Sequence, residues 1–230
     1  MASGTFEPQE TRLVRDLLEG IDIFVNVGAN VGYYCCHALS MGKPVIAVEP
    51  VVRNLHYLMR NIVENGWERQ VEIFPLAVGA RSDILKMWGG GTGASLIKGW
   101  SGVPSSYVTQ VPVLTLDRIL GNSLRGKRAL ILVDVEGAEY DMLQGAVASL
   151  ASEPRPIWII EIVALSHQPE GVKVNPYLVP TFEFFFNHGY MAKSTNSVHD
   201  VIGLDMVRSV ANGQGELSSA NFLFTAHQSQ

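Results

Sequence analysis

The sequence predicts an α/β protein of the doubly wound class, in which helices cover both faces of a mostly parallel sheet. Short apolar runs rich in β-branched residues alternate with segments of helical periodicity along the 230 residues. Only 17% of the residues are charged, below the ~25% typical of soluble domains, and 47% are hydrophobic. These values exclude a disordered chain and favour strands that are buried on both faces.

The apolar runs show little of the polar alternation of a half-exposed strand, which is typical of a parallel sheet between two helical layers. Strand, helix and strand at this spacing also imply right-handed βαβ units. We expect five buried strands and one further strand near the end of the chain, at residues 21–25, 45–48, 71–74, 129–133, 157–162 and 221–225.

Four helices are expected from apolar periodicity and from their end signals. The first closes at Gly42, with Pro44 just beyond it, and the second carries an apolar stripe from Leu55 to Val63 that includes Met59. The expected helices span residues 31–41, 50–66, 138–150 and 180–187. Apart from the last of these helices, we expect residues 168–214 to be irregular.

Residues 79–113 interrupt this alternation with seven glycines between Gly79 and Gly102. Two short strand candidates lie within the segment, at residues 84–88 and 107–113. We interpret it as an insertion that is either a plain surface loop or a lid over a substrate. The polar and aromatic side chains that a lid would use are Thr92, Ser95, Trp88, Trp100 and Tyr107. Otherwise we expect an N-terminal segment at residues 1–20 and a single domain at residues 21–230.

Charge and motif content exclude several functions. The formal net charge is −5, whereas a nucleic-acid-binding protein normally shows a basic face. Cys35 and Cys36 are adjacent and lack the spacing of a zinc site. No apolar run approaches the ~18 residues of a membrane span, and no targeting segment is recognisable. We therefore expect a cytoplasmic protein that binds no nucleic acid and spans no membrane.

A glycine-containing turn, residues 26–32 with the sequence NVGANVG, follows the first expected strand. In an open α/β sheet, ligands bind at the carboxyl ends of the strands, and this turn approaches them with its backbone. We expect Gly28 to allow that approach, Asn30 to adopt a left-handed backbone, and Gly32 to permit close packing of helix on strand. The G-x-N-x-G spacing differs from the G-x-G-x-x-G of dinucleotide sites and is typical of S-adenosylmethionine (SAM) sites.

Glu49 ends the second expected strand. It follows Gly28 by 21 residues, close to the ~20-residue offset of an acid that binds a ribose. A carboxylate suits a ribose because its two oxygens can accept hydrogen bonds from two adjacent hydroxyls. The alternative is an acid placed before a helix, where the helix dipole stabilises it.

Three acids, Asp134, Glu136 and Glu139, lie close together after the fourth expected strand. We expect Asp134 to face the same cleft as Gly28, where it would hold the ammonium group of a ligand or orient a substrate hydroxyl. A carboxylate without a partner at the end of an apolar strand is costly, which favours this role. The helix dipole is sufficient to explain Glu139.

Several segments occur in an order that resembles the FkbM family of methyltransferases. They are residues 25–33 (VNVGANVGY), 45–50 (VIAVEP), 61–66 (NIVENG), 77–79 (AVG), 114–117 (LTLD), 133–139 (VDVEGAE), 159–162 (IIEI) and 221–224 (NFLF). The resemblance, which covers residues 21–225, implies a class I methyltransferase with a Rossmann-like, mostly parallel seven-stranded sheet and an antiparallel last strand. It also implies SAM as the cofactor, and as acceptor a hydroxyl on a sugar, glycolipid or polyketide-type small molecule.

The resemblance also implies roles for individual residues. The turn residues would surround the methionine end of SAM, Glu49 its ribose and Ala77 the edge of its adenine. Asp134 and Glu136 would lie near the transferring methyl. The complete set expected around the cofactor is Asn26, Gly28, Ala29, Asn30, Gly32, Glu49, Pro50, Ala77 and Asp134. The family usually has an aspartate at the position of Asn26, so this chain keeps an acceptor oxygen there but loses a negative charge.

O-methylation benefits from a base, because an alcohol is a poor nucleophile unless its proton is withdrawn as the new bond forms. The candidate catalytic residues are Asp134, Glu136, Glu161 and His167. Hard oxygen ligands of this kind suit magnesium, but the sequence does not require a metal and we expect none.

Two other functions stay open at this point. A nicotinamide-dependent oxidoreductase is disfavoured by the G-x-N-x-G spacing, and a non-catalytic binding protein that keeps the fold is suggested by Asn26. The expected partner is a small-molecule or glycan acceptor. The sequence indicates neither its identity, nor oxygen against nitrogen as the methylated atom, nor the oligomeric state.

Overall fold

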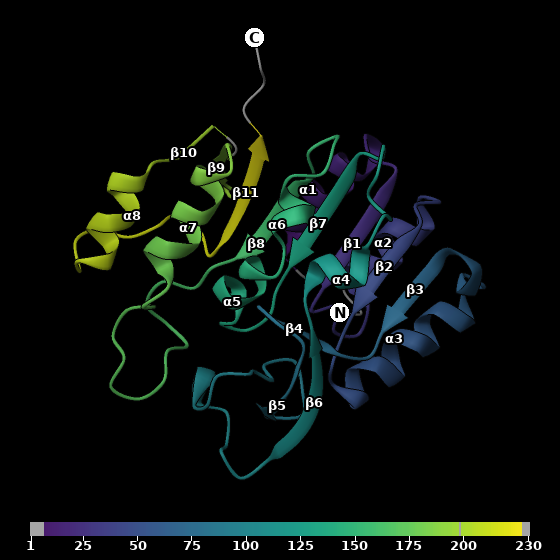
Figure 1. Ribbon diagram of the computed structural model, residues 1–230, viewed down its shortest axis with the longest axis horizontal. Coiled ribbons are helices and arrows are strands. Elements are labelled where there is room, and N and C mark those ends of the chain that lie inside the picture. Colours follow the sequence, from purple (N-terminus) through teal and green to yellow (C-terminus); the bar gives the residue numbers. More distant parts are fainter. Residues whose placement is uncertain (1–6, 198, 227–230) are drawn as a thin grey trace.

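The computed structural model describes residues 7–197 and 199–226. At its centre lies a sheet with the strand order β10-β9-β11-β8-β7-β1-β2-β3 (Figure 1). Its strands are β1 (Ile23–Val27), β2 (Val45–Val48), β3 (Val71–Phe74), β7 (Ala129–Val133), β8 (Ile157–Glu161), β9 (Tyr190–Ser194), β10 (Val201–Ile202) and β11 (Asn221–Ala226). The neighbours from β3 to β8 pair in parallel, and β11 is antiparallel to both β8 and β9.

This sheet confirms the predicted mostly parallel arrangement with an antiparallel last strand. Five of the six predicted strands match the observed bounds to within one residue, and β1 begins and ends two residues later than expected. The sheet has eight strands instead of seven. The additional strand arises because the chain turns back after β9, so that Val201 and Ile202 pair with Lys193 and Ala192 at the edge.

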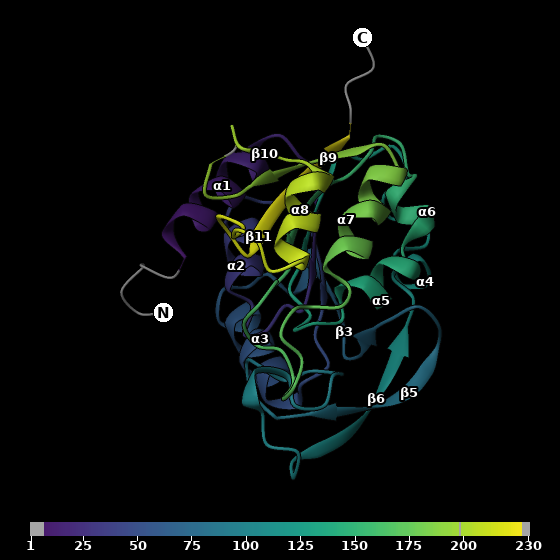
Figure 2. The ribbon, with the colours of Figure 1, turned by 90° about the vertical axis from the view of Figure 1, so that its left-hand side faces the viewer.

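Helices cover both faces of the sheet (Figure 2). One layer contains α1 (Pro8–Glu19), α2 (Tyr33–Ser40) and α3 (Val52–Glu64). The other contains α4 (Leu116–Leu120), α5 (Glu139–Gln144), α6 (Val147–Leu150), α7 (Leu178–Asn187) and α8 (Leu204–Ala211). Side chains alternate between the two cores, since Phe24 of β1 belongs to the first and Val25 to the second. In the described part of the chain, no helix combines the length and the apolar character needed to cross a membrane.

Some predicted helical segments need correction. The segment 138–150 forms two short helices, because the chain bends at Gly145, where a Cβ would lie 2.3 Å from the backbone oxygen of Gly79. Met59 and Val63 of α3 are 54% and 59% exposed, so its buried stripe is narrower than expected. Residues 168–214 are not irregular, since they contain β9, β10 and α8 as well as α7. Short 3-10 turns lie at η1 (Glu68–Gln70) and η2 (Trp100–Gly102).

The insertion forms a small sheet of its own beyond the carboxyl ends of the central strands (Figure 1). Its strands β4 (Ala77–Val78), β5 (Asp83–Trp88) and β6 (Val108–Leu114) have the order β4-β6-β5. A separate apolar cluster joins it to the rest of the protein through Val51, Ala77, Met87, Val111 and Val113. The predicted domain bounds and the insertion bounds of 79–113 stay predictions.

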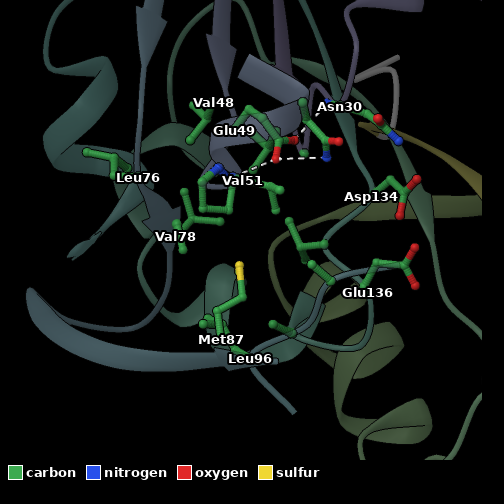
Figure 3. A pocket seen from close by; sticks show the side chains of 18 of the residues that line it. Asn30, Val48, Glu49, Val51, Leu76, Val78, Met87, Leu96, Asp134 and Glu136 are labelled. Atoms are coloured by element: carbon green, nitrogen blue, oxygen red, sulfur yellow. Dashed lines mark hydrogen bonds between the residues drawn. The ribbon is translucent and has the colours of Figure 1, made fainter. Parts of the chain in front are cut away.

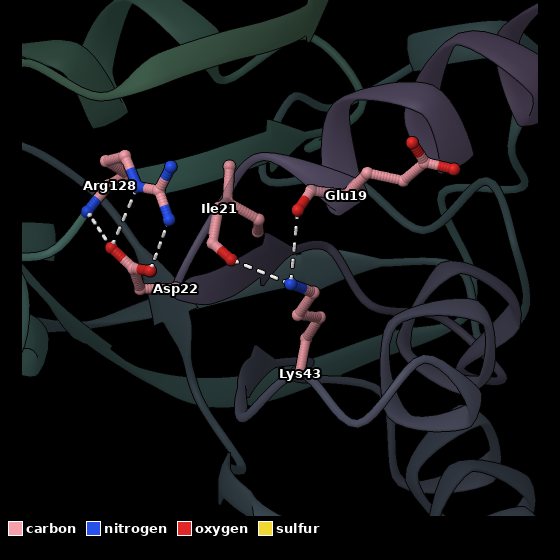
Figure 4. A network of polar contacts seen from close by, with 5 residues as sticks. All are labelled: Glu19, Ile21, Asp22, Lys43 and Arg128. Carbon is pink, nitrogen blue, oxygen red and sulfur yellow. Dashed lines mark hydrogen bonds and ion pairs between the residues drawn. The ribbon is translucent and has the colours of Figure 1, made fainter.

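At the amino ends of the central strands, polar contacts tie α1 and β1 to their neighbours (Figure 4). Lys43 Nζ donates to the carbonyl oxygens of Ile21 at 2.9 Å and Glu19 at 3.5 Å. Arg128 Nη2 lies 2.8 Å from Asp22 Oδ1, and the hydrogen bonds from Arg128 lower the pKa of Asp22 to about 2. The end of α1 is therefore fixed here, and its first turn lies toward the carboxyl edge of the sheet (Figure 2).

Candidate active site

The glycine turn between β1 and α2 is held against the end of β7. Gly28 has a φ of +83°, and a Cβ on it would lie 1.7 Å from the backbone oxygen of Asp134. The amides of Gly28 and Ala29 both donate to the carbonyl of Val48 at 2.9 Å. The packing of the protein on itself therefore requires glycine at residue 28, whereas the sequence suggested that it makes room for a ligand.

Asn30 and Gly32 complete this turn. Asn30 has a φ of 52°, which confirms the predicted left-handed backbone, and its amide donates to Glu49 Oε2 at 2.7 Å. A Cβ on Gly32 would lie 2.4 Å from Leu58 Cδ1 of α3. Gly32 thus leaves room for the side chain of Leu58 beside the start of α2, and its expected role in packing helix on strand stays a prediction.

Glu49 at the end of β2 is 3% exposed. Its Oε1 accepts hydrogen bonds from the amide of Val51 at 2.8 Å and from Asn54 Nδ2 at 3.2 Å. Burial raises the pKa of Glu49, and the hydrogen bonds from Val51, Asn30 and Asn54 oppose this rise. The carboxylate is held firmly by the protein. Among the described residues only the amide of Asn30 donates to Oε2, so this oxygen can still accept a hydrogen bond from a ligand hydroxyl.

A first cavity opens beside Glu49 (Figure 3). Apolar side chains, among them Leu76, Met87 and Leu96, form one side of it, and Asp134 and Glu136 lie on the other. The cavity brings together most of the predicted site residues, namely Gly28, Asn30, Glu49, Pro50, Ala77, Asp134 and Glu136. Its apolar wall and its single acid at the β2 end suit a nucleoside.

A second cavity lies between α1 and the carboxyl ends of β1, β7 and β8. It shares Gly28, Asn30 and Asp134 with the first cavity, so the two meet at these residues. The predicted residues Asn26, Ala29 and Glu161 line only this second cavity. The charged residues in its lining are all acidic, namely Glu7, Glu10, Asp134 and Glu161.

Several residues that line this cavity carry buried oxygen atoms without a donor. Within the described residues, Asn26 Oδ1 and Asn30 Oδ1 receive no hydrogen bond from the protein, and Asp134 Oδ1 receives none from an N–H or hydroxyl group, although its carboxyl interacts with that of Glu161. All three residues line the second cavity. Because buried acceptors without donors cost free energy, a ligand that brings hydrogen-bond donors or positive charge fits this wall. These residues therefore fit the ammonium and sulfonium groups of SAM.

Comparison with known families decides the class of the protein. Residues 26–191, more than half of the chain, match the family described as methyltransferase FkbM domain. The chain belongs to the FkbM methyltransferase family. This membership confirms the predicted family and, with it, a methyltransferase that uses SAM. No curated protein sequence matches the chain.

Solved methyltransferase structures share the fold of this FkbM-family protein. The O-methyltransferase from Bacillus cereus in complex with S-adenosylhomocysteine (SAH) is 12% identical to this chain, with a TM-score of 0.53. The match covers 95% of this chain and 80% of that chain. The O-methyltransferase TomG from Streptomyces achromogenes, involved in tomaymycin synthesis and in complex with SAM, is 11% identical to this chain, with a TM-score of 0.52. This match covers 96% of this chain and 80% of that chain. These two matches confirm the class I methyltransferase fold.

A further structure, methyltransferase FkbM from Methylobacillus flagellatus KT, is 20% identical with a TM-score of 0.44. The match covers 61% of this chain and 32% of that chain. The matched part of this chain therefore spans about a third of the length of that FkbM structure.

Three carboxyl groups of this FkbM-family protein meet beside the junction of the cavities. One oxygen from each of Asp134, Glu136 and Glu161 lies within 4.8 Å of the others. Burial, and next the charge of Glu161, raise the pKa of Asp134 well above its ordinary value, and burial raises the pKa of Glu161 to about 7. Two adjacent carboxyls repel each other when both are ionised, which favours a single proton shared between them. Oxygen ligands at this spacing can also hold a divalent cation, and the expected absence of a metal stays a prediction.

Glu136 fastens the insertion over the site. Its carboxylate Oε2 accepts a hydrogen bond from Trp100 Nε1 at 2.8 Å, and its backbone oxygen accepts one from Ser95 Oγ at 2.6 Å. Trp100 is 2% exposed and lies against Gly137, where a Cβ would come within 2.6 Å of the indole ring. Ser95 and Trp100 therefore hold the insertion in place and are not free to contact a substrate, while Thr92 lines the first cavity.

His167 does not join the site. The residue is exposed, its carbonyl accepts a hydrogen bond from the amide of Ser101, and its ring lies edge-on to Trp100 at 6.1 Å between centroids. His167 lines neither cavity, and neither does Gly32. Glu139, which the helix dipole seemed to explain, is 3% exposed and its Oε1 accepts a hydrogen bond from the amide of Gly137 at 2.9 Å.

Sequence reasoning missed the contribution of α1. Glu7 and Glu10 line the second cavity, and Tyr34 Oη donates to Glu7 Oε2 at 2.8 Å and to Glu10 Oε1 at 3.0 Å. The buried residues of α1 are Glu10, Val14 and Leu18, spaced four apart. The spacing of Val14 and Leu18 is typical of a helix that packs on a sheet. The pattern was not recognised in the sequence because a glutamate, Glu10, occupies the third position of the same stripe.

Proposed function

We propose that this protein transfers a methyl group from SAM to a hydroxyl group of a small molecule or glycan, such as a sugar, a glycolipid or a polyketide-type compound. The observation that carries the proposal is the junction of the two cavities at Gly28, Asn30 and Asp134. One cavity suits a nucleoside and the other suits positive charge, and SAM combines both in one molecule.

The first cavity supports binding of the adenosine part. Glu49 Oε2 is available to a ribose hydroxyl, and the apolar side chains of Leu76, Met87 and Leu96 offer contact to the faces of an adenine ring. Ala77 lines the same cavity, in agreement with its expected place at the adenine edge.

The second cavity supports binding of the amino-acid part. The unpaired oxygens of Asn26 and Asn30 and the surrounding carboxyls can accept hydrogen bonds from an ammonium group. When bound, SAM supplies a methyl group on a sulfonium, which is already an activated leaving group. The protein then has to hold the acceptor hydroxyl in line with that methyl group.

Asp134 and Glu161 are the groups proposed to take the proton of the acceptor hydroxyl. A base works best when its pKa lies near the working pH, and the pKa of Glu161 is raised to about 7 by burial. Asp134 lines both cavities, so it adjoins the place where a nucleoside site and a charged site meet. Glu136 anchors the insertion through Trp100 and also lines the first cavity.

Calorimetric titration tests the cofactor part of this proposal. We expect saturable binding of SAH and no binding of NADH to the full chain. Binding of NADH without binding of SAH would favour a nicotinamide-dependent oxidoreductase and overturn the proposal.

Transfer of a labelled methyl group from SAM tests the acceptor part. Sugars and polyketide-type alcohols are offered together with matched amines in which an amino group replaces one hydroxyl. Label in the alcohols supports O-methylation, whereas label in the amines alone contradicts it. SAH binding without transfer to any compound of the panel would favour a non-catalytic binding protein.

A further inference from the structure

Glu10 on α1 is a buried acid with an unused oxygen. The residue is 7% exposed, and its Oε1 accepts the hydrogen bond from Tyr34 Oη at 3.0 Å. Its Oε2 is buried and receives no hydrogen bond from the residues that the structure describes. A carboxyl in this condition costs free energy in the empty protein, so its presence points to a ligand with a donor or a positive charge.

Asn26 on β1 lines the same cavity, and its side-chain oxygen also lacks a partner in the described part of the protein. It is 2% exposed, its Nδ2 donates to Cys35 Sγ at 3.5 Å, and its Oδ1 has no donor in the described part of the protein. Asn26 on β1 and Glu10 on α1 thus line one cavity, and each carries a buried oxygen without a donor among the described residues. The oxygen of Asn26 belongs to a neutral amide, whereas the oxygen of Glu10 belongs to a carboxyl group.

We propose that Glu10 is the anionic partner of the α-ammonium group of SAM, and that it supplies from α1 the charge that Asn26 does not supply from β1. The inference rests on the proposed function, since it takes the second cavity as the place of the amino-acid end of SAM. It adds α1 to the cofactor site.

The surroundings of Glu10 fit this role. Tyr34 of α2 bridges Glu7 and Glu10, which fixes the first turn of α1 against the cavity. Lys43 holds the other end of the helix, at Glu19 and Ile21 (Figure 4). The start of α2 also lines the cavity, and the positive end of a helix dipole suits the carboxylate of the same amino-acid end.

Two ligands separate the amino-acid end from the rest of the cofactor. SAH carries the α-ammonium group, whereas 5′-methylthioadenosine lacks the whole amino-acid end but keeps the nucleoside and the sulfur. We expect Glu10→Gln to lower the affinity for SAH about tenfold, as for the loss of one charge-assisted hydrogen bond, and to leave the affinity for methylthioadenosine unchanged. Glu19→Gln, at the exposed far end of α1, is the matched control and should change neither affinity.

A second variant tests whether a carboxylate at residue 26 can replace the carboxylate at residue 10. Asn26→Asp in the Glu10→Gln background should restore most of the lost affinity for SAH. A double variant that binds SAH as weakly as Glu10→Gln alone would contradict the shared role.

Further outcomes overturn the inference. If Glu10→Gln leaves SAH binding unchanged, or weakens SAH and methylthioadenosine equally, Glu10 does not contact the ammonium group, while the proposed function stands. If the unaltered protein binds neither ligand, the proposed function fails and this inference fails with it.

Discussion

The backbone oxygen of Asp134 occupies the space in which a side chain on residue 28 would begin, 1.7 Å from the Cβ that an alanine would add. The amide of Asp134 in turn donates to the carbonyl of Val27 at 2.9 Å. The glycine turn after β1 and the acidic segment after β7 are therefore in direct contact. A change in the turn is expected to displace the acid that lines both cavities.

Gly28→Ala should destabilise the protein more than an alanine at another left-handed glycine. Gly42 has a φ of +72° and no neighbour within 4 Å of its Cβ position, so Gly42→Ala meets only the backbone strain of about 1–2 kcal/mol. Gly28→Ala adds the overlap with Asp134, which costs roughly a further 1–3 kcal/mol. Urea denaturation of both variants measures the difference. Equal free energies of unfolding would contradict this contact.

Turnover is expected to rise with pH through about 7. The base must be ionised to accept the proton of the acceptor, and burial raises the pKa of Glu161 to about 7. Glu161→Gln should lower kcat by about 100- to 10,000-fold and remove this rise, as for the loss of a general base. Glu170→Gln in the exposed loop beyond β8 is the control. A pH profile that is flat from about pH 6 to about pH 8 in the unaltered protein would exclude this pair as the base.

Chelation should leave this turnover intact. Asp134 and Glu161 share a proton in the proposed mechanism, which offsets their mutual repulsion without a cation. Activity that disappears with EDTA and returns with magnesium would instead make the three carboxyls metal ligands, at the spacing of 4.8 Å or less that they already have.

The central part of the fold was predictable because its signals are local. The strands β2, β3 and β7 were placed at their observed bounds, since each is an apolar run between breakers. β9 was missed because it alternates buried and partly exposed residues, with a lysine at residue 193. β10 has two residues, which is too short for any pattern.

The cofactor side of the site was predictable for a related reason. Gly28, Asn30 and Glu49 lie in one turn and at one strand end, so their spacing along the chain carries the information. Glu10 and Trp100 reach the site from segments far away in the sequence, and only the packing of α1 and of the insertion brings them there. His167 was misplaced because a loop after β8 can leave the cleft edge, and here it packs against Trp100.

Trp100→Phe should loosen the insertion. The variant loses the hydrogen bond to Glu136 Oε2 but keeps an aromatic ring beside Gly137. A hydrogen bond to a carboxylate contributes about 1.5–3 kcal/mol, so local opening becomes roughly tenfold or more frequent. Cleavage by trypsin after Lys98 should accelerate accordingly, while Trp88→Phe on β5 serves as the control. Unchanged cleavage in Trp100→Phe would show that this bond does not hold the insertion.

Glu139 should make the ligand-free protein less stable as the pH rises. Burial raises the pKa of Glu139 to about 8, above its ordinary value of 4.5. The folded protein therefore binds this proton more tightly than the unfolded chain does. The resulting stabilisation is complete below about pH 4.5 and is lost as the pH rises through about 8. Glu10 and Glu161, each with a pKa raised to about 7, act in the same direction.

Thermal unfolding between about pH 5 and about pH 8 measures this effect, and we expect Tm to fall across the range. Glu139→Gln keeps an acceptor oxygen for the amide of Gly137 but cannot ionise, so it should flatten the fall. Glu170→Gln, an exposed change of the same type, should keep the full slope. A Tm that rises with pH, or a slope equal in Glu139→Gln and the unaltered protein, would mean that the buried acid does not govern stability in this range.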